Sequence, residues 1–452
     1  MRKNNILNWI KLSSFIFALS ALFASCSNEL DEVLQPANNG TLQFVVSDFP
    51  MFGEGIQTRV IGTQDEGKTA WENGDEIIVT LISQKYGEQA VALTYNGSSW
   101  STEASLSYLE NETPSVSVFY APCYEVTEEG TMQLRSGMQL GMTEYLYGNY
   151  EIENGIMTIT FEGAIRDYSR LRIAGLANQT LTITTTDFTP AGVNNSSPES
   201  GEVPQAEGSV TYTLTTDNNG NAFLYGVFAE GATVSVKQGD ITLKDYTFTA
   251  EKNPNGTAHN KSYALDATPV IDGTLGGKAE ATEEDITALM EQLKAYVDNG
   301  ITTIIVPGTE YAMYKSNLGT IPAFAEALYL LTDLNEDSPY CGTIDLILPD
   351  ATEIIDFSFD SADALKSITL PKVTTVGDGA FYACYYLQTI TFGSVVTAIN
   401  HNTKAEFHWV GKKVEGCDLV LNREQVNAEA DYQPNIETRT WWNTEWKSIT
   451  LK

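Results

Sequence analysis

Residues 62–69 have the spacing of a phosphate-binding loop. They satisfy the pattern GxxxxGK[ST], in which glycine-rich backbone amides and a lysine surround phosphate oxygens. This chemistry requires a helix directly after the lysine, because the N-terminus of that helix faces the phosphates. The sequence Glu-Asn-Gly-Asp at 72–75 predicts a turn instead, and Asp65 and Glu66 would place two negative charges in the loop. We therefore interpret the segment as a loop that binds no nucleotide.

A second polar segment has part of the spacing of a calcium loop. Asp217, Asn219 and Asn221 stand at successive ligand offsets. However, Ala222 replaces the glycine that such a loop needs, and Phe228 stands where the bidentate glutamate belongs. We interpret this segment as a turn.

The histidines, serines and acidic residues show no spacing that is typical of a catalytic or metal site. The three histidines, His259, His401 and His408, are too far apart in the sequence to indicate a zinc cluster. The sequence has no Gly-x-Ser-x-Gly elbow to anchor a hydrolase triad. Nothing selects one pair among the 59 acidic residues for glycoside hydrolysis. The sequence therefore predicts a protein that is not an enzyme and has no metal or cofactor.

Four cysteines follow residue 26, namely Cys123, Cys341, Cys384 and Cys417. They form no paired CxxC motif of a metal site and are too few for a disulfide framework. We expect each to act as a small buried apolar side chain. The sequence leaves open whether any of them forms a disulfide.

The C-terminal region is rich in aromatic residues, namely Trp409, Tyr432, Trp441, Trp442 and Trp446. Aromatic faces can stack on sugar rings, which makes Trp441 and Trp442 candidates for glycan binding. The same residues could instead cover the end of a repeat array, whose apolar surface would otherwise meet water. We favour this second interpretation and keep the first as an alternative.

The first residues indicate export. Arg2, Lys3 and Lys11 accompany an uncharged stretch at 12–24, which is shorter than the about 20 helical residues that span a bilayer. Such a stretch is typical of a secretory signal. It ends in Leu-Phe-Ala-Ser-Cys, which resembles a bacterial lipobox with phenylalanine in place of the commoner leucine. The resemblance implies cleavage after residue 25 and lipidation of Cys26.

Acidic residues dominate the chain from that cysteine onward. Glu29, Asp31 and Glu32 resemble the export tag of lipoproteins on the outer face of the outer membrane, which implies a lipid-anchored protein facing the cell exterior. The whole chain has 59 acidic and 26 basic residues and a formal net charge of -33. Such a surface repels phosphate backbones, so we exclude nucleic acid as a partner.

Residues from about 41 to 266 have the pattern of a β fold. Short alternating runs rich in threonine, valine and tyrosine, such as 76–82 and 156–161, are separated by clusters of turn residues. The length of this region suits two β-sandwiches better than one. We assign residues 1–25 to a signal peptide, 26–40 to a linker, and 41–154 and 155–269 to two sandwiches.

Two helices are predicted after residue 270. Residues 282–285 have capping-box form and precede an apolar helical face, which Asn299 and Gly300 end. A second helix is expected from Pro322, a residue tolerated in a first turn, to about Thr332.

An internal repeat follows these helices. The Leu-Ile-Leu-Pro sequence at 346–349 is echoed 22 residues later at 368–371 and again at 390–393, before a slip of one residue at Ile399 and loss of the pattern. A fixed period predicts a solenoid, whose ends need caps. We assign 270–452 to a short capped solenoid. The predicted fold class is thus mainly β, with two tandem β-sandwiches followed by an α+β solenoid.

The repeat resembles a known family. The residues that carry this resemblance are 367–371 (Ser-Ile-Thr-Leu-Pro), 376–384 (Val-Gly-Asp-Gly-Ala-Phe-Tyr-Ala-Cys) and 387–390 (Leu-Gln-Thr-Ile). They closely resemble the BspA-type leucine-rich repeat. That family is typically found on bacterial surfaces and is associated with adhesion to host proteins and other cells.

The N-terminal half resembles the fimbrillin-like lipoproteins in Thr58-Arg59, in residues 71–77 and in residues 119–122. The resemblance implies two β-sandwiches that assemble by exchange of a strand. In stalk subunits an Arg-directed protease removes an N-terminal strand, which makes Arg59 a candidate processing site. An ordinary arginine at a strand edge is the favoured alternative. A solenoid after the sandwiches would hinder donation of a C-terminal strand, which favours a tip, accessory or free-standing protein.

From these patterns we expect a non-enzymatic cell-surface lipoprotein that acts in adhesion or as a fimbria-associated tip or accessory subunit. Its expected partners are the outer membrane through the lipid, host or bacterial surface proteins or glycans, and fimbrial subunits. The alternative is a glycan-binding outer-membrane lipoprotein of a nutrient-uptake system.

Overall fold

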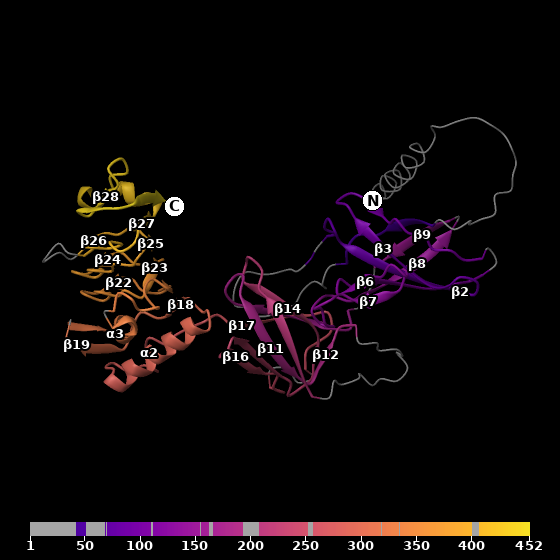
Figure 1. Ribbon diagram of the computed structural model, residues 1–452, viewed down its shortest axis with the longest axis horizontal. Helices are drawn as coiled ribbons and strands as arrows, with labels where there is room; N and C mark the ends of the chain where they lie inside the picture. The colour runs from indigo at the N-terminus through magenta and orange to yellow at the C-terminus, as the bar shows by residue number, and fades with distance from the viewer. Residues whose placement is uncertain are drawn as a thin grey trace, which may run out of the picture.

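The computed structural model describes residues 42–50, 68, 70–109, 112–153, 155–161, 166–192, 208–251, 256–317, 319–333, 335–399 and 406–452. The candidate lipidation residue Cys26 and the candidate processing residue Arg59 lie outside these residues. The chain forms three parts in sequence order, two built of strands and one of stacked coils with two helices (Figure 1). The mainly β fold class is therefore confirmed. Neither described helix is both long and apolar enough to cross a membrane.

The first part is one seven-stranded sheet around a single core. The strands are β1 (Gln43–Val46), β2 (Glu76–Ser83), β3 (Gly87–Tyr95), β4 (Trp100–Ser101), β5 (Ser115–Tyr120), β8 (Leu146–Glu153) and β9 (Ile156–Thr160), in the order β1-β9-β8-β5-β2-β3-β4. A separate hairpin consists of β6 (Tyr124–Val126) and β7 (Met132–Leu134). Strand β8 pairs with β5 through its first residues and with β9 through the rest, so one strand joins both halves of the sheet. Alternating residues Ile77, Val79 and Leu81 are buried in the core.

The second part is a sandwich of two four-stranded sheets. One sheet has the order β12-β14-β10-β17, with β10 (Ser169–Ala174), β12 (Phe188–Pro190), β14 (Asn221–Phe228) and β17 (Ser262–Asp266). The other has the order β13-β11-β15-β16, with β11 (Thr180–Thr186), β13 (Ser209–Thr215), β15 (Thr233–Gln238) and β16 (Ile241–Thr247). Ile173, Ile183, Leu224 and Val236 belong to the core between them.

The division between these two parts differs from the expected one. Strand β9 pairs antiparallel with β8 and parallel with β1, so it belongs to the first sheet. The change from one part to the next therefore falls after Thr160 rather than between residues 154 and 155. A short turn between two paired strands has the same glycine and asparagine signals as a linker between domains, which is why the sequence placed the division at this turn.

The third part is a solenoid of stacked coils. Its main sheet is parallel throughout and comprises β18 (Thr303–Ile305), β21 (Ile344–Ile347), β23 (Leu365–Leu370), β25 (Thr389–Phe392), β27 (Asp418–Leu421) and β30 (Ser448–Leu451). A second parallel sheet comprises β22 (Glu353–Ile354), β24 (Thr375–Val376) and β26 (Ala398–Ile399). Smaller elements are the hairpins β19 (Met313–Ser316) with β20 (Gly319–Pro322) and β28 (Thr440–Trp441) with β29 (Thr444–Glu445), and the 3-10 helices η1 (Arg423–Asn427) and η2 (Ala430–Tyr432).

Two helices close the first end of the solenoid. Helix α2 (Glu283–Asp298) begins with the expected capping box, in which Thr282 and Asp285 exchange side-chain and backbone hydrogen bonds. Helix α3 (Ala323–Thr332) begins one residue after the expected start, because Pro322 is its N-cap, and it ends before Asp333, which has a left-handed conformation. The two helices pack on one another beside the first coils (Figure 1).

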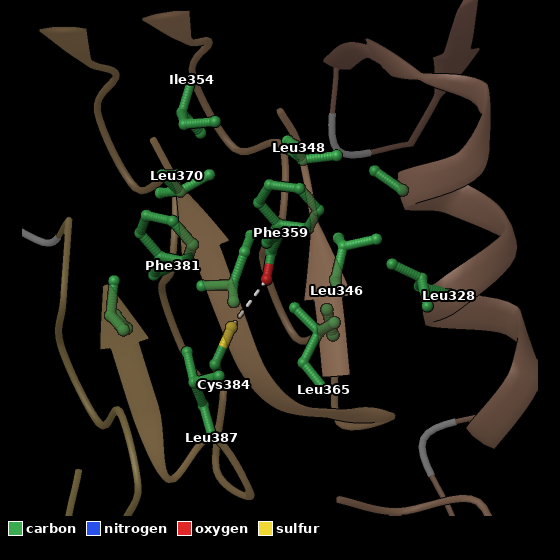
Figure 2. Packing of buried hydrophobic residues seen from close by; sticks show 14 of the residues in the cluster. Leu328, Leu346, Leu348, Ile354, Phe359, Leu365, Leu370, Phe381, Cys384 and Leu387 are labelled. Carbon is green, nitrogen blue, oxygen red and sulfur yellow. Dashed lines mark hydrogen bonds between the residues drawn. The ribbon is translucent and has the colours of Figure 1, made fainter. Parts of the chain in front are cut away.

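The repeat sets the register of the core. Ile368 pairs with Ile390 at the period of 22 residues, and Val376 pairs with Ile399 after the one-residue slip. Phe359 and Phe381 stack at 5.6 Å between ring centroids (Figure 2). The ring of Phe407 continues the stack, so the repeat resumes after Ile399 instead of ending there. Phe407 lies 26 rather than 22 residues after Phe381. Inserted residues had hidden this match in the sequence.

Candidate binding surface on the solenoid

The second end of the solenoid is closed by two of the C-terminal tryptophans. Trp441 and Trp446 are 1 % and 2 % exposed, and both pack on Phe407. The indole N–H of Trp441 donates to the carbonyl oxygen of Tyr432 at 2.9 Å, and that of Trp446 donates to the carbonyl oxygen of Trp441 at 3.2 Å. At this burial Trp441 presents no ring face to a sugar. Its position is that of a cap residue.

Trp442 differs from its neighbour because it is only partly buried. Its ring stacks on Tyr432 at 5.4 Å between centroids, with planes 3° from parallel. Trp441 and Trp442 therefore do not form a shared platform for a ligand. Tyr432 already covers one face of Trp442.

Four aromatic residues meet elsewhere, at the turns of the last repeats. Trp409 is 41 % exposed and lies 4.6 Å from His408, 5.3 Å from Tyr382 and 6.2 Å from Tyr385 between ring centroids. Tyr382 and His408 also stack on one another at 5.9 Å. We refer to Tyr382, Tyr385, His408 and Trp409 as the aromatic cluster.

The solenoid itself brings these residues together. Tyr382 and His408 each directly follow a phenylalanine of the stack, and the N–H of Ala383 donates to the carbonyl oxygen of His408 at 2.8 Å. Residues separated by 26 positions in the chain thus lie in adjacent coils. Asp360 occupies the corresponding position one coil earlier, so the aromatic character is specific to the last two turns.

Trp409 adopts an unusual backbone conformation for so large a side chain. Ser361, Ala383 and Trp409 stand at corresponding positions and have φ angles of 54°, 55° and 67°. This left-handed region is unfavourable for residues other than glycine, asparagine and aspartate. The two earlier turns place small residues there, whereas the last turn holds an exposed tryptophan. Backbone strain combined with an exposed ring is characteristic of functional positions.

Charged groups border the aromatic cluster. The Lys412 ammonium lies 5.1 Å from the centre of a Trp409 ring, within cation–π distance. Lys413 forms an ion pair with Glu336 at 2.6 Å. Beneath them Asp363 accepts a hydrogen bond from the Tyr385 N–H at 3.2 Å, and burial raises the pKa of its carboxyl to about 6. The cluster therefore combines aromatic surface with the Lys412 ammonium, whereas the charge of Lys413 is paired with Glu336.

This arrangement is suited to binding. Exposed tryptophan and tyrosine side chains carry a large share of the energy at protein interfaces, because they bury much area at low entropic cost. Among the residues that the structure describes, no three or more of His, Cys, Asp and Glu are grouped as metal ligands would be.

The polar side chains of the phosphate-loop-like and calcium-loop-like segments make hydrogen bonds and ion pairs within their own turns. The Lys68 ammonium pairs with Asp75, and the chain turns at residues 72–75, where a nucleotide loop would begin a helix. Residues 62–67 and 69 lie outside the described residues. The Asp217 carboxylate accepts the N–H groups of Asn219 and Asn221 at 2.8 and 2.9 Å, which stabilises a turn.

The four cysteines described are free thiols. Cys123, Cys384 and Cys417 are buried, and Cys341 is partly exposed. Burial raises the pKa of each thiol, which keeps it protonated.

The parallel sheet and its stacked phenylalanines define the C-terminal part as a leucine-rich-repeat solenoid. Residues 340–407 match the family model of the BspA type leucine rich repeat region, which describes six copies of the repeat. The expected resemblance to this family is therefore confirmed in this region. No curated protein matches the chain. Among solved structures, the chain is similar to a candidate cell adhesion protein of Bacteroides fragilis at 14 % identity, over 50 % of this chain and 92 % of that one, with a TM-score of 0.27.

Sequence reasoning missed three members of the aromatic cluster. From the sequence, Trp409 was placed with Trp441 and Trp446 because all three lie in the C-terminal region. In the structure Trp409 is exposed, whereas Trp441 and Trp446 are buried in the cap. Aligning Phe407 with Phe381 would have placed His408 over Tyr382. The cluster could thus have been found in the sequence, because Tyr382 and His408 each stand one residue after a stacked phenylalanine.

Proposed function

We propose that the protein is a non-enzymatic adhesion protein of the bacterial surface, which binds a protein partner through the aromatic cluster of its solenoid. The observation that carries this proposal is the exposed, strained Trp409 among three other aromatic rings, directly after the residues that match the BspA-type repeat. The two β-sandwiches would act as a spacer between this surface and the membrane. Lipidation of Cys26 would hold the protein at the outer membrane with its solenoid facing outward.

Adhesion can be tested with purified protein, without its signal peptide, coupled to latex beads. Attachment of the beads to cultured epithelial cells and to other bacteria is counted for the parent, for Trp409→Ala and for Tyr382→Ala. We expect both variants to lose most of the attachment. Tyr86→Ala, which removes a tyrosine 47 % exposed in the turn between β2 and β3, is the matched control and should attach like the parent. Equal attachment by Trp409→Ala and the parent would contradict the proposal.

The lipid anchor needs a separate measurement. Growth with a radiolabelled fatty acid should label the parent protein and leave Cys26→Ala unlabelled. Protease treatment of intact cells should then degrade the parent. Survival of the protein on unbroken cells would contradict display at the surface.

A glycan is the second candidate partner, because the exposed ring of Trp409 could stack on a sugar. Soluble polysaccharides added to the bead assay would then compete for attachment, as the nutrient-uptake alternative also requires. A role in fimbriae predicts instead that the protein co-purifies with sheared fimbriae. Cleavage after Arg59 would be visible as a new N-terminus at residue 60.

A further inference from the structure

The two sheets of the solenoid begin at different coils. The main sheet begins at β18, in the coil that precedes the first repeat. The second sheet begins one coil later, at β22, which among the described strands pairs with β24 alone. After β18 the chain turns into the hairpin of β19 and β20 instead of supplying a strand beside β22. One edge of β22 therefore has no neighbouring strand among the described residues.

The backbone of Glu353 points toward that position. Thr352 and Ile354 accept the N–H groups of Thr374 and Gly377 at 2.9 and 2.7 Å, so their carbonyl groups face β24. Backbone groups of successive residues in a strand alternate in direction. The N–H and C=O of Glu353, between these two residues, thus face the open edge.

A cleft of about 780 Å³ lies along this edge. Its lining includes Glu353 and Ile354 of β22 together with Gly308 and Tyr311, which precede β19. Phe324 and Phe359 contribute apolar surface to its walls. Pockets of this volume hold small ligands or a few residues of peptide.

Tyr311 places a polar group in the cleft wall. Its hydroxyl is buried and has no hydrogen-bond partner among the described residues. A buried hydroxyl without a partner is unfavourable, so a small movement of this wall that exposes the hydroxyl to an acceptor on the occupant would be favoured. Burial raises the pKa of Tyr311 to about 12, so the hydroxyl keeps its proton and can donate it to an acceptor.

The rim of the cleft is negatively charged. Glu310 and Glu353 are exposed, and no Lys or Arg among the described residues lies within ion-pair distance of either. Lys278, which also lines the cleft, pairs with Asp285 at 2.7 Å. These charges favour an occupant with basic residues beside its apolar ones.

We propose that this cleft binds an extended segment of a partner protein, with apolar side chains at alternate positions and a basic flank, which pairs with β22 as an added strand. Unpaired strand edges bind peptides in this way, since the main-chain hydrogen bonds give affinity and the adjoining pocket selects the side chain. The proposal is independent of the aromatic cluster and of the adhesion function.

The test uses the full chain without its signal peptide and a fluorescein-labelled, capped hexapeptide of sequence Lys-Val-Thr-Val-Thr-Lys, with binding followed by anisotropy. Saturable binding is expected. Glu353→Pro, which removes the edge N–H, should weaken it at least tenfold, whereas Glu353→Ala should retain binding with a smaller loss. Tyr311→Phe should weaken it about threefold to tenfold, as expected for one hydrogen bond. Thermal unfolding of each variant checks that it folds.

A second probe keeps the test decisive if Glu353→Pro does not fold. The same peptide methylated on every backbone nitrogen has no N–H to donate on either edge, and it should not bind the parent protein. A peptide with glutamate in place of both lysines should bind more weakly than the original. No binding of the original peptide, or equal binding of the methylated one, would overturn the proposal.

Discussion

The rings of Phe381 and Phe407 lie 5.6 Å apart between centroids, with planes 7° from parallel, although 26 residues separate them. Phe359 stacks on the other side of Phe381 at the same distance. The three rings form a continuous column through the solenoid. Trp441 and Trp446 then pack against Phe407, so the column runs from the repeats into the C-terminal cap.

Removal of the last ring should uncouple the cap from the repeats. Phe407→Ala leaves a cavity among buried side chains, and we expect it to lower the free energy of unfolding by about 3–5 kcal/mol. Urea denaturation followed by tryptophan fluorescence measures this change. Trp409→Ala, two residues away and exposed, should change it by less than about 1 kcal/mol. Similar losses for both variants would show that the column is not the main support of the cap.

The buried thiol of Cys384 should be unreactive in the folded protein. Its Sγ donates to the Phe359 carbonyl oxygen at 2.9 Å, in the preceding coil, and burial holds its pKa well above the ordinary value (Figure 2). Thiol titration with a disulfide reagent, in a Cys26→Ser chain, should modify Cys341 first, because that side chain is the only partly exposed one of the four described. The others should react only after denaturation. Mass spectrometry of the labelled peptides identifies the order, and early labelling of Cys384 would contradict it.

Asp363 should make the solenoid less stable at neutral than at acidic pH. Burial raises its folded-state pKa from 3.8 to about 6, so the folded state holds the proton more tightly than the unfolded state. The stability that this group contributes is present below about pH 4 and is lost as the pH rises to about 6. Asp363→Asn should remove this loss and stabilise the protein at pH 7 by about 2 kcal/mol relative to the parent.

Unfolding of both proteins between pH 4 and pH 7 measures the difference. Asp337→Asn, an exposed aspartate before the same repeat, is the control and should leave the pH dependence unchanged. A parent and an Asp363→Asn variant with parallel pH profiles would rule out a raised pKa at this position.

An ion pair between Arg166 and Glu144 should stabilise the region where the two sandwiches join. The two groups lie 2.9 Å apart and are almost fully buried, and Arg166 also donates to the Pro50 carbonyl oxygen at 2.8 Å. Glu144→Ala leaves a buried guanidinium without its carboxylate, which should cost about 3–5 kcal/mol of unfolding free energy. Lys366→Ala removes an exposed pair with Asp345 and should cost less than about 1 kcal/mol. Calorimetry distinguishes these values.

Periodic features were predicted well from the sequence. The 22-residue repeat requires Ile368 and Ile390 to pair in register, because each coil buries the same apolar positions against its neighbours. The capping box at Thr282 is equally local, since both hydrogen bonds connect residues three positions apart. Such features depend on nearby residues and so remain visible in one sequence.

Features that depend on distant residues were missed. The pairing of β1 with β9 decides where the first part ends, and nothing near Asn154 indicates it. The aromatic cluster depends on the insertion between Phe381 and Phe407, which shifts His408 out of the simple period. Trp441 and Trp409 look alike in the sequence, and only the stacking of coils makes one a buried cap and the other an exposed ring.

The parallel pairing of β10 with β17 has a consequence for biosynthesis. A ribosome delivers residues 169–174 long before residues 262–266, so the edge of β10 has no partner during most of the synthesis of this sandwich. Distant pairings of this kind form slowly, whereas solenoid coils associate with neighbours 22 residues away. Strand edges of the second part therefore stay unpaired for longer than those of the solenoid coils, and a nascent chain that stops before residue 262 cannot complete this part.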